Sequence, residues 1–226
     1  MTLAALRLAV ALLVAGLLGG CGATQFQTAR TLPMGAFGGY AGISFVGNEQ
    51  FKQRDVSVYN FQPDFGFRYG ILNGLELDIN QIFVAGLQVA AKATLVPPDG
   101  DFALSVKAGL GAAADLGDFG EAWLLEIPVT LLASYRFGPV EPYVGIGYNF
   151  FWIFGRSLTD PPPNAVDEER KGYGDGVIRA TVGLDFPLTE RVGLLVEYTF
   201  MPAVVNDPGD NFAFVDNHIG SIGVRF

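Results

Sequence analysis

The chain has one histidine, His218, and hydrolytic chemistry of the usual kind would have to use it. Histidine serves as a general base when a hydroxyl nucleophile or a carboxylate lies beside it. The residue two positions after His218, on the same side of an extended strand, is Gly220, so the nucleophile is missing. Asp210 and Asp216 are the only acids that could cooperate with it. We therefore expect a structural histidine in a protein that is not an enzyme.

Metal and nucleic-acid chemistry have equally little support from the residue types. Asp207, Asp210 and Asp216 could gather a calcium ion, but their spacing matches no EF-hand loop. The single cysteine, Cys21, allows neither a disulfide framework nor a cysteine-based metal cluster. A net charge of -9 argues against nucleic acid as the main partner. We expect no cofactor, no metal ion and no nucleic-acid partner.

The first twenty residues have the pattern of a secretory signal sequence. Arg7 supplies a positive charge, and Leu8–Leu18 form an apolar stretch that is too short to cross a bilayer. The ending "LGGC" resembles the lipobox, the site at which bacterial signal peptides are cleaved before a cysteine that carries lipid. We predict a signal peptide over residues 1–20 and lipidation of Cys21. The alternative is an ordinary signal peptide cut nearby, such as after Ala23, without lipid.

The residue after the cysteine bears on the destination. It is Gly22, not the aspartate that resembles an inner-membrane retention signal, so delivery to the outer membrane is favoured. We expect residues 21–34 to be a lipidated tether, in which "GATQFQTARTLP" forms a short periplasmic linker. A single domain is expected over residues 35–226, because the chain is long enough for one core and too short to need two.

This domain has the composition and periodicity of strands that face two different environments. Hydrophobic residues make up 50% of the chain and charged residues only 16%, and no helix-sized apolar run follows the N-terminus. Apolar and polar residues alternate with period 2, whereas no dozen residues carry a helical stripe. Ten strands are expected, at residues 35–45, 58–70, 75–83, 86–95, 102–114, 122–137, 142–154, 175–187, 192–204 and 216–226.

The connections between these strands are short and long in turn. "LNG", "PPDGD", "GPVE" and "TER" have the residue types that close hairpins. The other connections are mostly longer and more polar, above all in "TDPPPNAVDEER". Outer-membrane barrels place short turns in the periplasm and long loops outside. We expect loops 46–57, 155–175 and 205–215 to be extracellular and to be where a partner binds.

Each strand separates its side chains into an apolar face and a face that holds the charges. The charged face contains Arg68, Glu76, Asp78, Lys92, Lys107, Glu126, Arg136, Arg179, Asp185, Glu197 and Arg225. Alternation alone also fits a soluble two-sheet sandwich, but bulky aromatic residues near both strand ends favour the two interfaces of a membrane.

In a membrane barrel the charged face lines the lumen. Its five acids and six bases can pair almost completely, which favours a salt-bridged, plugged interior. Candidate pairs join Glu126 to Arg136 or Lys107, and Arg179 to Asp185 or Glu197. Glycines on the same face are expected to make room for arginine and tyrosine side chains: Gly38, Gly42, Gly109, Gly145, Gly147, Gly183 and Gly223. The alternative is a pore lined by selectivity charges.

The chain ends in "GSIGVRF", whose alternate residues Gly220, Ile222, Val224 and Phe226 lie on the apolar side. This ending resembles the assembly signal of bacterial outer-membrane barrels, which finish on an aromatic residue. From about Gly35 to its end, the chain is similar to small outer-membrane β-barrel proteins. The resemblance implies a transmembrane antiparallel up-and-down barrel of about ten strands, with eight as the alternative and both termini in the periplasm. Its implied partners are outer-membrane lipid and the barrel-assembly machinery.

The resemblance also sets the functional alternatives. Lipid A deacylases carry a lipid-facing His-x-Ser pair, and His218 resembles that histidine, but Gly220 stands where the serine would be. An omptin-like protease would need a second acidic pair that the chain does not supply at a recognisable spacing. We expect a non-enzymatic outer-membrane lipoprotein that acts structurally or through its loops. The alternatives are a narrow channel for small solutes and a lipid-modifying enzyme.

Overall fold

The computed structural model describes residues 25–50, 58–82, 86–96, 99–114, 122–155, 173–189, 191–206 and 212–226. Within these ranges the chain forms ten β-strands. They are β1 Phe37–Gln50, β2 Val58–Leu72, β3 Leu75–Ile82, β4 Gly86–Val96, β5 Phe102–Ala114, β6 Ala122–Tyr135, β7 Glu141–Gly155, β8 Tyr173–Pro187, β9 Gly193–Asn206 and β10 Phe212–Arg225. No helix in the described ranges has the length and apolar character to span a membrane. Cys21, residues 1–20 and most of the three long loops lie outside the described residues.

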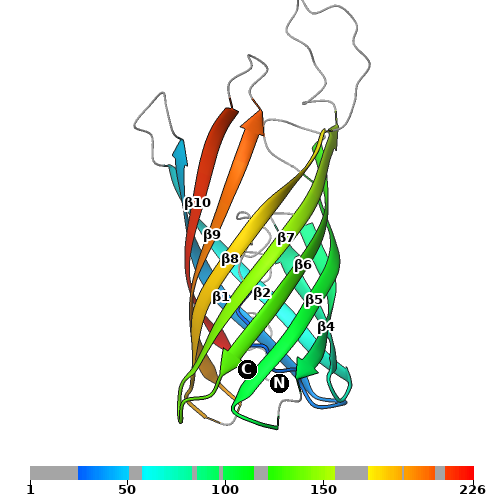
Figure 1. The fold of residues 1–226 in the computed structure, drawn as a ribbon, viewed down its shortest axis with the longest axis vertical. Coiled ribbons are helices and arrows are strands. Elements are labelled where there is room, and N and C mark those ends of the chain that lie inside the picture. The colour runs from blue at the N-terminus through cyan, green and yellow to red at the C-terminus, as the bar shows by residue number, and fades with distance from the viewer. Residues whose placement is uncertain are drawn as a thin grey trace, which may run out of the picture.

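Each strand pairs antiparallel with its neighbours in sequence, and the sheet closes on itself between β1 and β10 (Figure 1). At this seam Ile43 lies opposite Ile222. The Gly39 N–H donates to the Phe226 carbonyl over 2.8 Å, and the Phe226 N–H donates to the Gly39 carbonyl over 2.9 Å. The predicted all-β, ten-stranded up-and-down barrel is confirmed. The eight-stranded alternative is wrong, because β3 and β4 pair with each other and with both of their other neighbours.

The wall extends further toward the long loops than the sequence indicated. β1 continues to Gln50, β8 begins at Tyr173 and β10 begins at Phe212, all within stretches that were expected to be loop. Parts of the predicted loops are therefore strand. At the end of β1, backbone pairing continues through the polar residues Asn48, Glu49 and Gln50, so the apolar alternation that marks a strand in the sequence fades before that strand ends.

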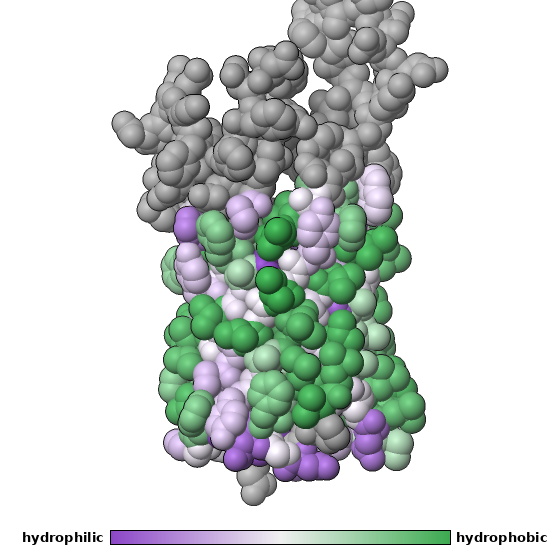
Figure 2. Space-filling model, viewed as in Figure 1, coloured by the Kyte–Doolittle hydropathy of each residue, from purple (hydrophilic) through white to green (hydrophobic). Residues whose placement is uncertain are grey.

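The two faces of the wall have opposite character. Apolar side chains of the outer face are exposed, such as Ile146, Val182 and Ile222, whereas alternate side chains such as Thr199 and Ser221 are buried. Figure 2 shows apolar residues over much of the described surface on the face in view, and hydrophilic residues at its lower rim. Exposed aromatic residues lie toward both strand ends: Tyr69, Phe102, Tyr135, Phe137 and Phe226 near the short turns, and Phe45, Trp123 and Trp152 toward the long loops. The predicted alternation is confirmed.

Two glycines shape the short turns. Gly74, between β2 and β3, has φ +85°, and Gly138, between β6 and β7, has φ +54°. Residues with a Cβ rarely adopt these left-handed conformations. The short turns lie together at one end of the barrel, which is the lower end in Figure 1, and we call it the short-turn end.

Candidate functional site

Of the described residues that precede β1, Gln25 to Leu32 lie in the barrel interior and Pro33 and Met34 are exposed at its end; we call residues 25–34 the lumenal segment. Its first five residues, Gln25 to Ala29, are each at most 8% exposed although they belong to no strand. The expectation of a linker outside the barrel is therefore wrong for the described part of residues 22–33. The segment's main-chain groups find partners on the inner wall, and such long-range partners leave no mark in local composition.

The lumenal segment enters at the short-turn end and runs inward. At the entry, the Met34 N–H donates to Asn73 Oδ1 in the turn between β2 and β3, over 3.3 Å. Further along, Arg30 reaches Glu141 at the start of β7, on the other side of the ring of strands. The Gln25 N–H then reaches Glu197, four residues inside the end of β9. From Met34 back to Gln25, the segment thus crosses the short-turn end and then extends into the lumen.

Glu197 binds the inner end of the lumenal segment. Its Oε1 accepts the main-chain N–H of Gln25 over 2.7 Å, and its Oε2 accepts that of Phe26 over 2.8 Å. From the wall, Tyr143 Oη donates to Oε2 over 2.8 Å and Thr199 Oγ1 donates to Oε1 over 3.2 Å. Four donors therefore surround a carboxylate that is 2% exposed. Because a buried charge is costly without donors, the wall and the segment stabilise each other.

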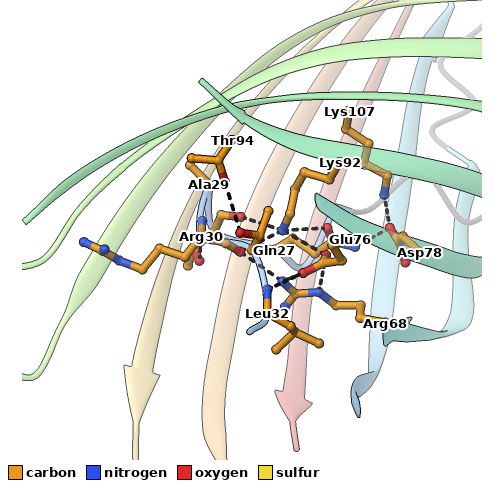
Figure 3. A network of polar contacts seen from close by, with 12 residues as sticks. Gln27, Ala29, Arg30, Leu32, Arg68, Glu76, Asp78, Lys92, Thr94 and Lys107 are labelled. Carbon is orange, nitrogen blue, oxygen red and sulfur yellow. Dashed lines mark hydrogen bonds and ion pairs between the residues drawn. The ribbon is translucent and has the colours of Figure 1, made fainter. Parts of the chain in front are cut away.

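Glu76 binds the outer half of the segment together with two cations of the wall (Figure 3). Arg68 donates to both oxygens of Glu76, each over 2.7 Å. Lys92 Nζ lies 3.1 Å from Glu76 Oε1. The segment supplies a further donor to this carboxylate: the Leu32 N–H donates to Glu76 Oε2 over 2.8 Å. Strand register brings these groups together, since Glu76 lies directly opposite Lys92.

Lys92 extends this network along the main chain of the segment. Its Nζ donates to the carbonyls of Arg30 (2.9 Å) and Thr28 (3.3 Å), and to Gln27 Oε1 over 3.4 Å. The Gln27 side chain in turn donates to Asp78. The Lys92 side chain is fully buried, so these acceptors and Glu76 replace the water that its ammonium group would otherwise bind.

Phe26 is the apolar anchor of the segment. Its side chain is buried against Tyr40, with ring centroids 5.6 Å apart, in a cluster that includes Tyr143 and Leu195. A Cβ at Gly42 would lie 2.7 Å from the Phe26 ring, so this inward glycine makes the space. Phe26 also has φ +40°, a left-handed conformation that costs about 1–3 kcal/mol in a residue with a Cβ. The two hydrogen bonds at Glu197 and the ring packing hold the chain in this conformation.

Arg30 and Glu141 join the segment to the rim, and neither was among the predicted lumen charges. Arg30 Nε donates to Glu141 Oε1 over 3.0 Å, and Ser134 Oγ donates to the same oxygen over 2.7 Å. A terminal nitrogen of Arg30 donates to the carbonyls of Gly100 (2.9 Å) and Asp101 (2.6 Å). Sequence reasoning missed Arg30 because it lies in the expected linker. Glu141 has the parity of the inward residues of β7, and this was the available signal.

Most of the predicted lumen charges lie in the interior. These are Arg68, Glu76, Asp78, Lys92, Lys107, Glu126, Arg179, Asp185 and Glu197. Arg225 lies nearer the rim, where its Nε donates to Asp185 Oδ2 over 2.6 Å. Arg136 is not a lumen residue: it lies beyond the last residue of β6, its side chain is 52% exposed, and it approaches Glu141 only to 3.8 Å.

The pairing of Lys107, Glu126 and Asp185 differs from the predicted partners. Lys107 pairs with Asp78 instead of Glu126, and Glu126 accepts a hydrogen bond from a glutamine of β4. Asp185 pairs with Arg225. Parity fixes which side of the wall a residue faces, but the register between strands decides which charges meet, and one sequence does not give that register.

His218 faces outward, as its parity predicts. Its Nδ1 lies 2.5 Å from Tyr198 Oη, and its ring packs against Phe200 with centroids 5.2 Å apart. Outward parity also applies to Gly220, so the residue beside the histidine on this face offers no nucleophile. The arrangement is that of a ring among aromatic side chains.

The structure does not describe the side chains of the acids that were considered for catalysis or calcium binding. Asp207, Asp210 and the side chain of Asp216 lie outside the described residues. Across the described ranges, no three histidine, cysteine, aspartate or glutamate side chains are placed to hold a metal ion.

An apolar outer surface around a polar, charged interior is the inverse of a soluble protein, and a closed barrel built this way is a transmembrane β-barrel. The chain belongs to the outer membrane protein beta-barrel domain family, whose sequence profile matches residues 13–226. It is therefore a protein of the bacterial outer membrane.

Comparison with solved structures finds similar proteins of distant sequence. The outer membrane protease OmpT from Escherichia coli is 10% identical, with a TM-score of 0.51 over 88% of this chain and 99% of that chain. Neisserial surface protein A is 13% identical, with a TM-score of 0.41 over 84% of this chain and 95% of that chain. Ail, the attachment invasion locus protein of Yersinia pestis, is 11% identical, with a TM-score of 0.34 over 85% and 99%. No curated protein sequence matches this chain significantly.

Proposed function

We propose that this protein is a non-enzymatic outer-membrane barrel whose lumen is plugged by its own lumenal segment, and that it acts structurally or binds partners through its extracellular loops. The observation that supports a plugged lumen is the set of hydrogen bonds that Glu197, Glu76 and Lys92 form with the main chain of the segment. In this proposal the short-turn end and both termini face the periplasm.

The energetics of the interior support a closed lumen. A ten-stranded barrel is narrow enough for side chains to fill most of its width, and a polypeptide across it leaves little free path. A solute path through the short-turn end would require the segment to move. Each hydrogen bond to a charged group that breaks in that movement costs about 1.5–3 kcal/mol. Several must break together, so the closed state is strongly favoured.

A lipid on Cys21 is proposed for a second form of the protein, and it rests on the "LGGC" motif after the apolar stretch. In that form the lumenal segment is withdrawn from the lumen, because the four residues that lead from Cys21 to Gln25 cannot span from its docked position to the membrane. An acyl anchor would add a second attachment to a barrel that already spans the membrane. The loops form the outward-facing part: residues 46–57, 155–175 and 205–215, of which the proline-rich "TDPPPNAVDEER" is the most polar. Rigid scaffolds commonly carry their binding residues on such loops.

The test of the plug is electrical. Purified full-length protein, folded in detergent and added to planar bilayers, should give no stable unitary conductance. The variant Phe26→Ala/Arg30→Ala, which removes both side-chain anchors of the segment, should give openings, with Met34→Ala as the matched control because that side chain is exposed. Protein with the native sequence that conducts in stable unitary steps would overturn the plugged lumen and would favour the alternative, a narrow channel for small solutes.

A further inference from the structure

The barrel interior binds the lumenal segment chiefly through the segment's main chain. Wall side chains accept main-chain N–H groups at Gln25, Phe26, Ala29, Leu32 and Met34. Wall cations donate to main-chain carbonyls at Thr28 and Arg30. Recognition of main-chain groups by a fixed surface is one way in which proteins bind peptides, and it suits many sequences because these groups are the same in each of them.

Two side chains give this binding its specificity. Phe26 fills an aromatic site made by Tyr40 and the space above Gly42. Arg30 fills a second site, where Glu141 and two turn carbonyls accept its N–H groups. The two sites are occupied by residues four apart in the chain. The Phe26 site lies in the interior of the barrel, and the Arg30 site lies at the rim of the short-turn end.

The segment is attached to the barrel as a tethered ligand. It joins β1 through Met34 and Gly35, which are both exposed at the short-turn end. The segment's buried apolar side chains are few, since only Phe26 and Ala29 belong to the interior clusters. A short tether keeps such a ligand at an effective concentration of about millimolar. The site is therefore mostly occupied even where the intrinsic affinity of the segment is modest.

We propose that the lumen is a peptide-binding site, open to the short-turn end, for a peptide with an aromatic residue four positions before an arginine. The chain fills the site with its own residues 25–34, and a separate peptide of the same pattern can replace them. The inference rests on the proposed function, because it names the ligand of the plugged lumen. It goes further in treating the plug as exchangeable.

The experiment separates the tether from the ligand after folding. A recognition sequence for a specific protease is inserted between Met34 and Gly35 of the full chain, and the folded protein is cut in detergent. The probe is a fluorescent synthetic peptide of residues 22–34, GATQFQTARTLPM. We expect the cut segment to stay with the barrel and to exchange with the probe in a saturable way. Uncut protein should exchange far less, because the tethered segment competes.

Variant peptides report which contacts matter. Phe26→Ala and Arg30→Ala peptides should each bind about tenfold or more weakly, the effect of losing one good anchor. The Met34→Ala peptide, with a change at an exposed side chain, should bind like the parent. Absence of saturable binding to cut protein that still migrates as a folded barrel would overturn the inference, as would equal binding of all three variants.

The result is distinguishable from failure of the proposed function. Uncut protein that conducts in planar bilayers contradicts the plugged lumen whatever the peptides do. Uncut protein that is silent, together with cut protein that ignores the probe, leaves the plug in place and removes only its exchangeability.

Discussion

Glu197 on β9 accepts the main-chain N–H of Phe26 at 2.8 Å, although 171 residues separate the two in sequence. The same carboxylate also accepts the N–H of Gln25. A buried acid of the wall thus accepts two peptide N–H groups as well as the hydroxyls of Tyr143 and Thr199. The lumen charges of this barrel bind the chain's own segment as well as one another.

Replacing Glu197 with Gln should loosen the inner end of the segment. A glutamine has one acceptor oxygen, and its amide would face the second N–H donor, so docking should lose about 2–3 kcal/mol. Trypsin cleavage after Arg30, timed on folded protein in detergent, should speed up at least about tenfold. Asp185→Asn is the matched control, because Asp185 pairs with Arg225 at the rim. Equal cleavage of both variants would contradict this role for Glu197.

The contact between Lys92 and Glu76 should behave as a coupled pair. Lys92→Met leaves its acceptors buried without their cation and should destabilise the folded barrel by about 3–5 kcal/mol. The double variant with Glu76→Gln should be less unstable than the sum of the single variants by about 1–3 kcal/mol. Urea unfolding in lipid vesicles measures all three. The exposed Arg136→Met should cost at most about 1 kcal/mol. Strict additivity would mean that the pair is not coupled.

Deletion of Phe226 should impair assembly in cells. This residue exchanges two hydrogen bonds with Gly39 at the seam, and its ring lies against that glycine. Loss of the terminal pairing and of the aromatic ending should lower the folded outer-membrane level several-fold, more than deletion within any long loop. Immunoblots of membrane fractions, with and without heating, measure the folded protein. Val224→Ala on the same face is the control, and normal levels of the truncated protein would refute the assembly role.

The position of the segment bears on the lipid proposed for Cys21. Only four residues lead from Cys21 to Gln25, a span of at most about 14 Å, whereas Gln25 is bound well inside the barrel. That span is too short to leave the lumen and pass around the wall to the lipid. Protein labelled at Cys21 by an alkyne fatty acid should therefore be cut after Arg30 by trypsin, because its segment is withdrawn. Protein refolded without residues 1–20 carries no lipid and should be protected. Protection of both forms would contradict this exclusion.

His218→Ala should leave lipid chemistry unchanged. The ring is held by Tyr198 and Phe200 on the outer face and has no nucleophile beside it. Mass spectrometry of lipid A and phospholipids from cells with either form should give identical species. The folded barrel should lose at most about 1 kcal/mol, the scale of one exposed hydrogen bond and ring contact. A missing or new lipid species would revive the enzymatic alternative.

The wall of this barrel could be predicted from sequence because period-2 alternation is a local property. Outward residues such as Ile146 and inward residues such as Glu76 separate by parity alone, and the aromatic ending marked the last strand. The inward glycines were predicted to make room for arginine and tyrosine side chains. Gly183 does so for Tyr143, whereas Gly42 makes room for Phe26. These features depend on neighbours in the chain, which a single sequence displays.

The interior could not be predicted in the same way. The contact of Lys107 with Asp78 depends on the relative register of β3, β4 and β5. The lumenal segment was missed for a related reason. "TQFQTAR" has no strand alternation and little apolar character, and its burial follows from partners such as Glu197 that lie far along the chain. The burial of its two glutamines and its arginine could be explained only from the charged wall residues that they contact.

Four contacts of the lumenal segment, at Met34, Leu32, Ala29 and Gln25, close increasing distances along the chain. Met34 meets Asn73 across 39 residues, and Leu32 meets Glu76 across 44. Ala29 meets Ser134 across 105 residues, and Gln25 meets Glu197 across 172. Because closing longer loops costs more entropy and takes longer, the outer end of the segment can settle while later strands are still unplaced. The contact of Gln25 with Glu197 closes the longest of these loops, so the inner end of the segment can dock only once β9 is in place.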